Sequence, residues 1–193
     1  MSALAQAAAF LLNTLFGLFT LALLLRLYLQ LVNAPFHNPF SQAVVTLTNF
    51  AVRPARRIIP SWGWLDTASL LLAYASQLLL QLGILWLNDF PLLVAGAQVY
   101  IALFALAALG ILKLSIYIFL YAVLLLAVLS WVNPYTPLSP VLDSLTRPLL
   151  RPLRKFITKP GAMDLTPLII FIIAELLLML LVAPLEQQLL KLF

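Results

Sequence analysis

Few side chains in this sequence are of the kinds that perform chemistry. There is one histidine, His37, and no cysteine, so thiolate chemistry, disulfides and a zinc site are not expected. Ser41 and Ser139 precede basic segments and lack a base that could activate both of them. No glycine-rich phosphate loop and no pair of acid/base carboxylates is present. We therefore expect no enzyme activity, no catalytic residue and no bound cofactor.

The cations have a more informative spacing. The pattern R-P-x-R-[RK]-[IF]-I occurs twice, at a shift of 98 positions. It comprises Arg53, Pro54, Arg56, Arg57 in the first copy and Arg151, Pro152, Arg154, Lys155 in the second copy. One interpretation is that these charges set topology and bind anionic lipid headgroups, at roughly 1 kcal/mol each. The other is a docking surface for a membrane or cytoplasmic protein, because topology requires charge but no particular spacing.

Three polar residues fall inside apolar stretches, namely Glu175, Lys113 and Gln77. Glu175 follows Asp164 by eleven residues, or about 16 Å of helix, and the 98-residue shift aligns it with Gln77. An intramembrane carboxyl usually faces a partner or a water-filled cavity, and Lys113 is the candidate partner. These residues indicate either an ion pathway or, as we favour, a structural pair or a neutral Glu175.

The elements that must position these residues are membrane-spanning helices. Hydrophobic residues make up 64% of the 193 positions and charged residues only 9%, against about 25% in a typical soluble domain. A spanning helix needs about 20 apolar residues. Apolar segments at about 4–32, 66–88 and 165–183 meet this length. The N-terminal segment lacks a basic n-region, so we interpret it as a retained helix.

The segment 91–132 allows two interpretations. It crosses once, after an interfacial or re-entrant piece, or twice, with a tight turn near Gly110–Lys113. Eight of eleven cations lie in the two loops at 33–65 and 133–164. The positive-inside rule puts both loops in the cytoplasm, and it gives no reason to expect direct nucleic-acid binding. One crossing is therefore favoured, with parallel repeats at 1–90 and 91–193; two crossings would invert the second repeat.

Each basic loop is predicted to contain an amphipathic helix in the headgroup plane. Asn38 and Thr136 are the predicted caps, each followed by a proline. The predicted apolar stripes comprise Phe40, Val44, Leu47, Ala51 and Leu138, Val141, Leu142, Leu145, Leu149. Pro54 and Pro152 are expected to break or kink these helices. Arg26, near the cytoplasmic boundary, is expected to extend outward to the headgroups.

These loops resemble the signature of the YggT family. The first copy is Leu25-Arg26-Leu27-Tyr28, Asn38-Pro39-Phe40-Ser41, Leu47-Thr48-Asn49 and the run 53–60; the second is Thr136-Pro137-Leu138-Ser139, Leu145-Thr146-Arg147 and the run 151–157. The second copy departs from the pattern in having Thr-Pro-Leu for Asn-Pro-Phe and no match to Pro60. The resemblance implies a multi-pass protein of the bacterial inner membrane, with links to osmotic and ion stress tolerance or to cell division.

The sequence thus predicts an all-α membrane protein with two tandem helix–basic loop–helix units. It has four transmembrane helices, with five as the alternative, plus interfacial helices. The predicted function is a non-catalytic scaffold or assembly factor whose basic loops dock a partner or anionic lipid. The alternative function is an ion or small-solute channel or transporter that contributes to osmotic balance.

Overall fold

The protein is a bundle of helices with no long strand, described here from a computed structural model that covers residues 3–60, 62–133, 135–156 and 166–193. Three helices are single spans: α1 (Ala3–Leu31), α3 (Thr67–Leu87) and α4 (Ala97–Val132). The fourth span is made of α6 (Thr166–Leu177), a π-helical turn (Leu178–Val182) and α7 (Ala183–Leu190). Each is long and apolar enough to cross a membrane, which confirms an all-α, multi-pass membrane fold.

The segment 91–132 crosses once. After a short 3₁₀ turn at Leu92–Val94, α4 is a continuous helix through Gly110 and Lys113, where the alternative required a turn. Its 36 residues correspond to about 54 Å of helix, more than the hydrocarbon thickness of about 30 Å. Because of this excess length, the C-terminal end of α4 extends beyond the hydrocarbon thickness, toward the second basic helix.

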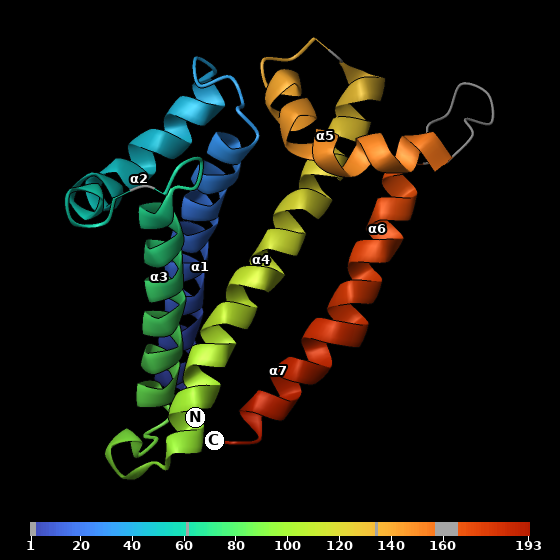
Figure 1. Cartoon of the computed structure of the whole chain (residues 1–193). Coiled ribbons are helices and arrows are strands. Elements are labelled where there is room, and N and C mark those ends of the chain that lie inside the picture. Colours follow the sequence, from blue (N-terminus) through green and yellow to red (C-terminus); the bar gives the residue numbers. More distant parts are fainter. Residues whose placement is uncertain (1–2, 61, 134, 157–165) are drawn as a thin grey trace.

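The two basic helices, α2 (Pro39–Ile58) and α5 (Ser139–Phe156), lie at the same end of the bundle, and both chain termini lie at the other end (Figure 1). Helix order is therefore the same in both halves: a span, a basic helix, and a returning span. Pro54, Pro148 and Pro152 all lie inside continuous helices, so the first of the two expected outcomes, a break rather than a kink, does not occur. The arrangement is that of parallel repeats.

Polar residues set the ends of several helices. Asn38 caps α2, accepting a hydrogen bond from the backbone N–H of Phe40, as predicted. By contrast α5 begins at Ser139, two residues later than expected, and Thr136 bonds the hydroxyl of Ser139. At the ends of α1 and α3, Asn33 (φ 50°) and Asp89 (φ 54°) adopt left-handed backbone conformations. Such residues reverse the chain and satisfy the last carbonyls of a helix.

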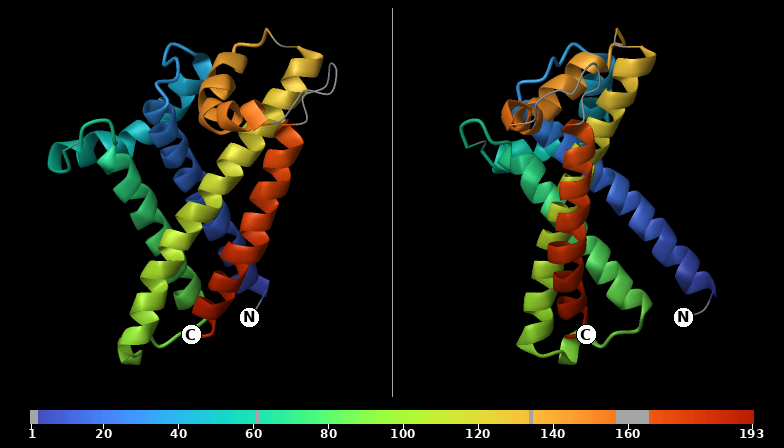
Figure 2. Two further views of the ribbon diagram at one scale, coloured as in Figure 1. Left: turned by 45° about the vertical axis from the view of Figure 1, so that its right-hand side comes forward. Right: turned by 90° about the vertical axis from the view of Figure 1, so that its right-hand side faces the viewer.

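The spans pack in the order α1, α3, α4, α6. Helix α3 lies between α1 and α4, whereas α6 packs mainly on α4 and, at its basic end, on α5. Figure 2 shows α1 splaying away from α6 toward its N-terminus. The largest apolar cluster centres on Leu23, Leu24 and Leu27 of α1 and extends to Leu142 and Leu145 of α5. The second basic helix is thus built into the core of the bundle.

The fourth span changes its winding where Pro184 enters. A proline has no N–H to donate to the carbonyl four residues earlier, and its ring clashes there. The π-helical turn at Leu178–Val182 immediately precedes this position and widens the helix. Leu178 and Val182 nevertheless remain buried against Leu109 of α4, so the span stays attached to the bundle.

Candidate functional site

Helix α2 has three faces rather than two. One face is buried against the bundle and contains Ser41, Val44, Thr48 and Val52. The second is apolar and exposed, and the third is polar and exposed with Arg53 and Arg57. The exposed apolar residues are Phe40, Leu47, Phe50, Pro54 and Ile58. An exposed apolar face beside a cationic face is the arrangement of a helix lying at a membrane surface.

The residues of the predicted apolar stripe of α2 are therefore in two environments: some are exposed and others face the bundle. Phe40 and Leu47 are exposed as expected for lipid contact, whereas Val44 faces the bundle. Thr48, expected on the polar side, is fully buried, and its hydroxyl donates to the carbonyl of Val44. The prediction failed here because it assumed a single environment for the whole stripe, whereas the bundle covers only part of it.

Helix α5 has two faces. Its apolar face packs on the bundle, with Val141, Leu142, Leu145 and Leu150 buried, whereas Leu149, which was predicted on that face, is 36% exposed. The opposite side is cationic, and its exposed members are Arg147, Arg151, Arg154 and Lys155. Arg147 pairs with Asp143 one turn earlier at 2.7 Å. The apolar face of α5 is therefore covered by protein, and the lipid contact expected for it is largely replaced by core packing.

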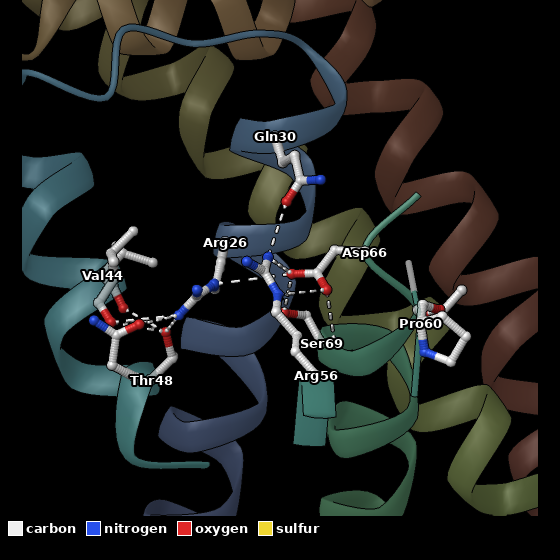
Figure 3. Close-up of polar contacts among 11 residues, drawn as sticks. Arg26, Gln30, Val44, Thr48, Arg56, Pro60, Asp66 and Ser69 are labelled. Carbon is white, nitrogen blue, oxygen red and sulfur yellow. Dashed lines mark hydrogen bonds and ion pairs between the residues drawn. The ribbon is translucent and has the colours of Figure 1, made fainter. Parts of the chain in front are cut away.

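The first basic helix is joined to α1 and α3 by a buried ionic network (Figure 3). Asp66, the N-cap residue of α3, is fully buried, with its Oδ2 2.6 Å from Arg56 Nη2 and 3.9 Å from Arg26 Nε. Ser69 donates its hydroxyl to the same oxygen at 2.6 Å. Gln30 of α1 accepts a second hydrogen bond from Arg56 at 3.2 Å. The carboxylate thus links three helices.

Arg26 does not extend outward, contrary to the prediction. It is buried and turns toward α2, where its Nη1 donates to Thr48 Oγ1 and to Asn49 Oδ1, each at 2.9 Å (Figure 3). Its charge is compensated by Asp66. A buried arginine with such partners is retained inside the protein because the guanidinium can satisfy several acceptors at once.

Burial of Asp66 would by itself raise the pKa of its carboxyl group. Hydrogen bonds from Arg56 and Ser69, together with the charge of Arg56, outweigh that effect and hold the pKa below its ordinary value. Asp66 is therefore ionised at neutral pH, and the network is held together by charge.

The eight predicted docking residues consequently have different roles. Arg56 is committed to Asp66, although its side chain is 40% exposed. Arg154 also has a contact of its own. Among the residues that the structure describes, Arg53, Arg57, Arg151 and Lys155 are exposed and form no ion pair. Pro54 and Pro152 lie exposed beside them. The cations available for docking are thus two in each helix.

These two pairs of cations lie at opposite edges of one end of the bundle. The basic helices begin side by side, where Asn38 donates its side-chain amide to the carbonyl of Pro137. They then diverge, so that their cationic C-terminal ends lie far apart on either side of the bundle (Figure 1). The two pairs therefore lie toward opposite sides of the bundle and do not merge into one compact patch.

The three intramembrane polar residues do not meet. Gln77 is buried between α1 and α4, with its Nε2 3.2 Å from Thr20 Oγ1. Its carboxamide lies over Gly110, where an added Cβ would come within 2.5 Å of Gln77 Oε1. Ser76 completes this cluster, its hydroxyl 2.9 Å from that of Thr20. Such hydrogen bonds between helices hold spans together in lipid.

Lys113 pairs with Glu186 of α7 at 2.7 Å, not with Glu175 as the sequence suggested. Glu175 instead lies exposed on α6. Because the three groups occupy separate places, they form no continuous path of the kind that the transport hypothesis requires. Gln77 and Glu175, which the 98-residue shift aligns, lie at similar distances from the starts of α3 and α6.

The ionic network was missed at the level of sequence, although two signals pointed to it. Arg26 is part of the first copy of the family signature, and Asp66 aligns with Asp164 at the 98-residue shift. Asp164 lies outside the described residues, as do Ser61, Ile157, Thr158 and Lys159. Only the first-half network can therefore be described.

Comparison with known proteins places the chain in a family. The family model described as CCB3/YggT matches two segments, residues 5–87 and 105–185. An uncharacterised protein of Pseudomonas aeruginosa is 38% identical over 184 residues, 94% of this chain and 91% of that protein. The uncharacterised protein YggT of Escherichia coli K12 is 36% identical over 166 residues, 85% and 83% of the two chains.

A third relative, an uncharacterised protein of Haemophilus influenzae, is 31% identical over 171 residues, 88% of each chain. No solved structure matches. The two matched segments coincide with the two successive sets of span, basic helix and span. By this double match, and by relatives that align along most of their length, the chain belongs to the CCB3/YggT family.

Proposed function

We propose that this protein is a non-catalytic scaffold of the bacterial inner membrane whose two basic helices dock anionic phospholipid headgroups on the cytoplasmic side. The observation that carries the proposal is a pair of exposed cations in each helix that form no ion pair with any described residue: Arg53 and Arg57, and Arg151 and Lys155. Cations near an anionic surface are each attracted by roughly 1 kcal/mol. Cytoplasmic placement follows from the positive-inside rule.

The surroundings of these cations favour lipid over a single compact protein ligand. In α2 they adjoin an exposed apolar face, and in α5 they lie opposite the face that enters the core. The same end of the bundle exposes Trp62, Trp64, Trp131 and Tyr135, residue types that concentrate at membrane interfaces. Because the two cation pairs diverge toward opposite sides of the bundle, they are positioned for surrounding lipids. A scaffold of this kind would support stress tolerance or division through the lipids it gathers.

The test is lipid selectivity in reconstituted bilayers. Brominated phosphatidylglycerol or brominated phosphatidylcholine quenches tryptophan fluorescence on contact, and the ratio of the two reports preference. Trp86, at the far end, is replaced by phenylalanine throughout, so that the signal comes from Trp62, Trp64 and Trp131. We expect the parent protein to prefer phosphatidylglycerol several-fold, with less preference at high salt.

The decisive variant carries Arg53→Gln, Arg57→Gln, Arg151→Gln and Lys155→Gln. It leaves Arg56 and Arg154 in place, since their loss would disturb contacts within the protein. We expect its selectivity to fall to near unity, while Lys191→Gln, a cation at the opposite end, keeps the parent value. Unchanged selectivity in the fourfold variant would overturn lipid docking and leave a protein ligand as the occupant to seek.

A further inference from the structure

The outward side of α6 carries a carboxyl group that the fold leaves uncovered. Glu175 lies roughly 14 Å beyond the start of α6, near the middle of a hydrocarbon core about 30 Å thick. Its side chain is exposed and has no hydrogen bond or ion pair with the described part of the chain. Ionisable groups at this depth are costly in lipid and almost always face protein or water.

In the first half of the chain, the residue that corresponds to Glu175 is covered by neighbouring helices. Gln77, aligned with Glu175 by the 98-residue shift, lies on α3 between α1 and α4, where Thr20 and Gly110 enclose it. Among the described helices, α6 packs on α4 and, at its basic end, on α5, and has no comparable contact with a second span. A polar side chain at this depth is therefore enclosed by a neighbouring helix in one repeat and lacks that neighbour in the other.

Glu175 lies in an exposed apolar stripe suited to helix packing. The stripe contains Leu168, Ile172 and Met179, which are 56%, 49% and 71% exposed. With Glu175 these residues follow the 4-3-4 spacing by which one helix packs along another. The stripe is distinct from the face that contacts α4, which contains Ile170, Ala174 and Leu178.

We propose that a second copy of this chain covers this stripe, α6 against α6, with the two Glu175 side chains facing each other. A two-fold axis along the membrane normal preserves depth, so each Glu175 meets a group at its own depth. A neutral carboxyl both donates and accepts hydrogen bonds, which makes two of them self-complementary. The contact is isologous and therefore closes as a dimer.

The pairing of charges within the chain supports a second copy as the partner that covers the stripe of α6. The cations in the described spans, Arg26 and Lys113, are engaged by Asp66 and Glu186. A second copy thus brings no unpaired cation at this depth, and the carboxyl pair is the complementary contact that identical chains can form.

The absence of native cysteine makes the contact directly measurable. The full chain is expressed with Ile172→Cys, the membranes are oxidised with copper phenanthroline, and dimer is measured on non-reducing gels. Ile173→Cys is the matched control, because this neighbour is also isoleucine and is 44% exposed but lies about 100° around the helix. We expect several-fold more dimer from Ile172→Cys, and similarly from Met179→Cys.

Equal yields from Ile172→Cys and Ile173→Cys would indicate random collision and overturn the proposal. The proposal is also overturned if the Ile172→Cys and Met179→Cys variants both remain monomeric, or if their cross-linked products have a mass other than that of a dimer. The role of the carboxyl is tested in the Ile172→Cys background. Glu175→Gln is expected to keep the cross-link, because a carboxamide also donates and accepts. Glu175→Leu inserts at least as readily and is expected to lose it several-fold; an undiminished yield would refute the carboxyl pair.

Discussion

Arg56 Nη2 lies 2.6 Å from Asp66 Oδ2, so the basic end of α2 is fixed to the first turn of α3. A second bond joins Arg56 Nε and Asp66 Oδ1 at 3.3 Å, making the contact two-pronged. Such paired geometry is characteristic of arginine and carboxylate. It determines the direction in which α2 presents its remaining arginines, and it makes the network the first target for mutation.

Asp66→Ala should be strongly destabilising, because it leaves Arg26 and Arg56 without their counter-charge. Breaking a buried pair by removing one partner typically costs about 3–5 kcal/mol. Thermal unfolding in detergent measures the effect. The control is Asp143→Ala, which breaks an exposed pair between residues one helical turn apart and should cost about 0.3–0.5 kcal/mol. Equal shifts for the two variants would show that the buried network contributes little.

The same network predicts a pH dependence. Because the pKa of Asp66 is lower in the folded protein than its ordinary value, the stabilisation is complete above that ordinary value, about 3.9. It is lost as pH falls from there through the lower folded pKa. Melting temperatures of the parent should therefore drop more steeply below about pH 4 than those of Asp66→Asn. Parallel curves for the two proteins would contradict this assignment.

Gly110→Ala should disturb the contact between α3 and α4. Its new Cβ would meet Gln77 Oε1 at 2.5 Å, so the carboxamide must shift, which disturbs its hydrogen bond with Thr20. Hydrogen bonds between spans average about 0.6 kcal/mol, with values to about 1.7, and we expect a loss in that range. Gly17→Ala is the matched control, because a Cβ there meets nothing within 4 Å. In the Gln77→Ala background Gly110→Ala should cost little further stability, because the clash and the hydrogen bond to Thr20 are already gone.

The pair between Lys113 and Glu186 should hold α7 against α4. Lys113→Glu or Glu186→Lys alone places like charges together, so limited proteolysis should cleave the C-terminal residues faster. The double exchange, Lys113→Glu with Glu186→Lys, should restore protection, because it re-forms the 2.7 Å contact in reverse. If the double variant is as sensitive as the single ones, attraction between these residues does not secure the helix.

Membrane orientation can be measured with single cysteines in intact cells. Ile58→Cys and Tyr135→Cys lie at the basic end and Val94→Cys at the other, all at exposed positions. A membrane-impermeant thiol reagent should label only Val94→Cys if the basic end faces the cytoplasm. If Ile58→Cys and Tyr135→Cys are labelled and Val94→Cys is not, the basic end faces the outside of the cell and the proposed orientation is wrong. Labelling of one of them would conflict with the parallel arrangement of α2 and α5.

Much of this architecture follows from sequence patterns that depend on local chemistry. Four long apolar segments predict four spans, because backbone groups in lipid must be satisfied within a helix. The repeated R-P-x-R pattern predicts two equivalent basic helices, and Asn38 before Pro39 predicts where the first begins. The charges of the loops favour one crossing through Gly110, but glycine itself is compatible with a turn and with a helix packed closely on a neighbour. In the structure α4 is continuous through Gly110, which packs closely on Gln77.

The sequence by itself determined the class of fold, the family and the positions of the cations, because each depends on composition, periodicity or repetition. Only the tertiary structure decided which cations are available. Arg56 and Arg53 occupy the same basic segment, but Asp66 engages the first and leaves the second exposed. Likewise Gln77 is enclosed and its counterpart Glu175 exposed. Those differences arise from which helix lies beside each residue, and that is a property of the packed bundle that local sequence does not encode.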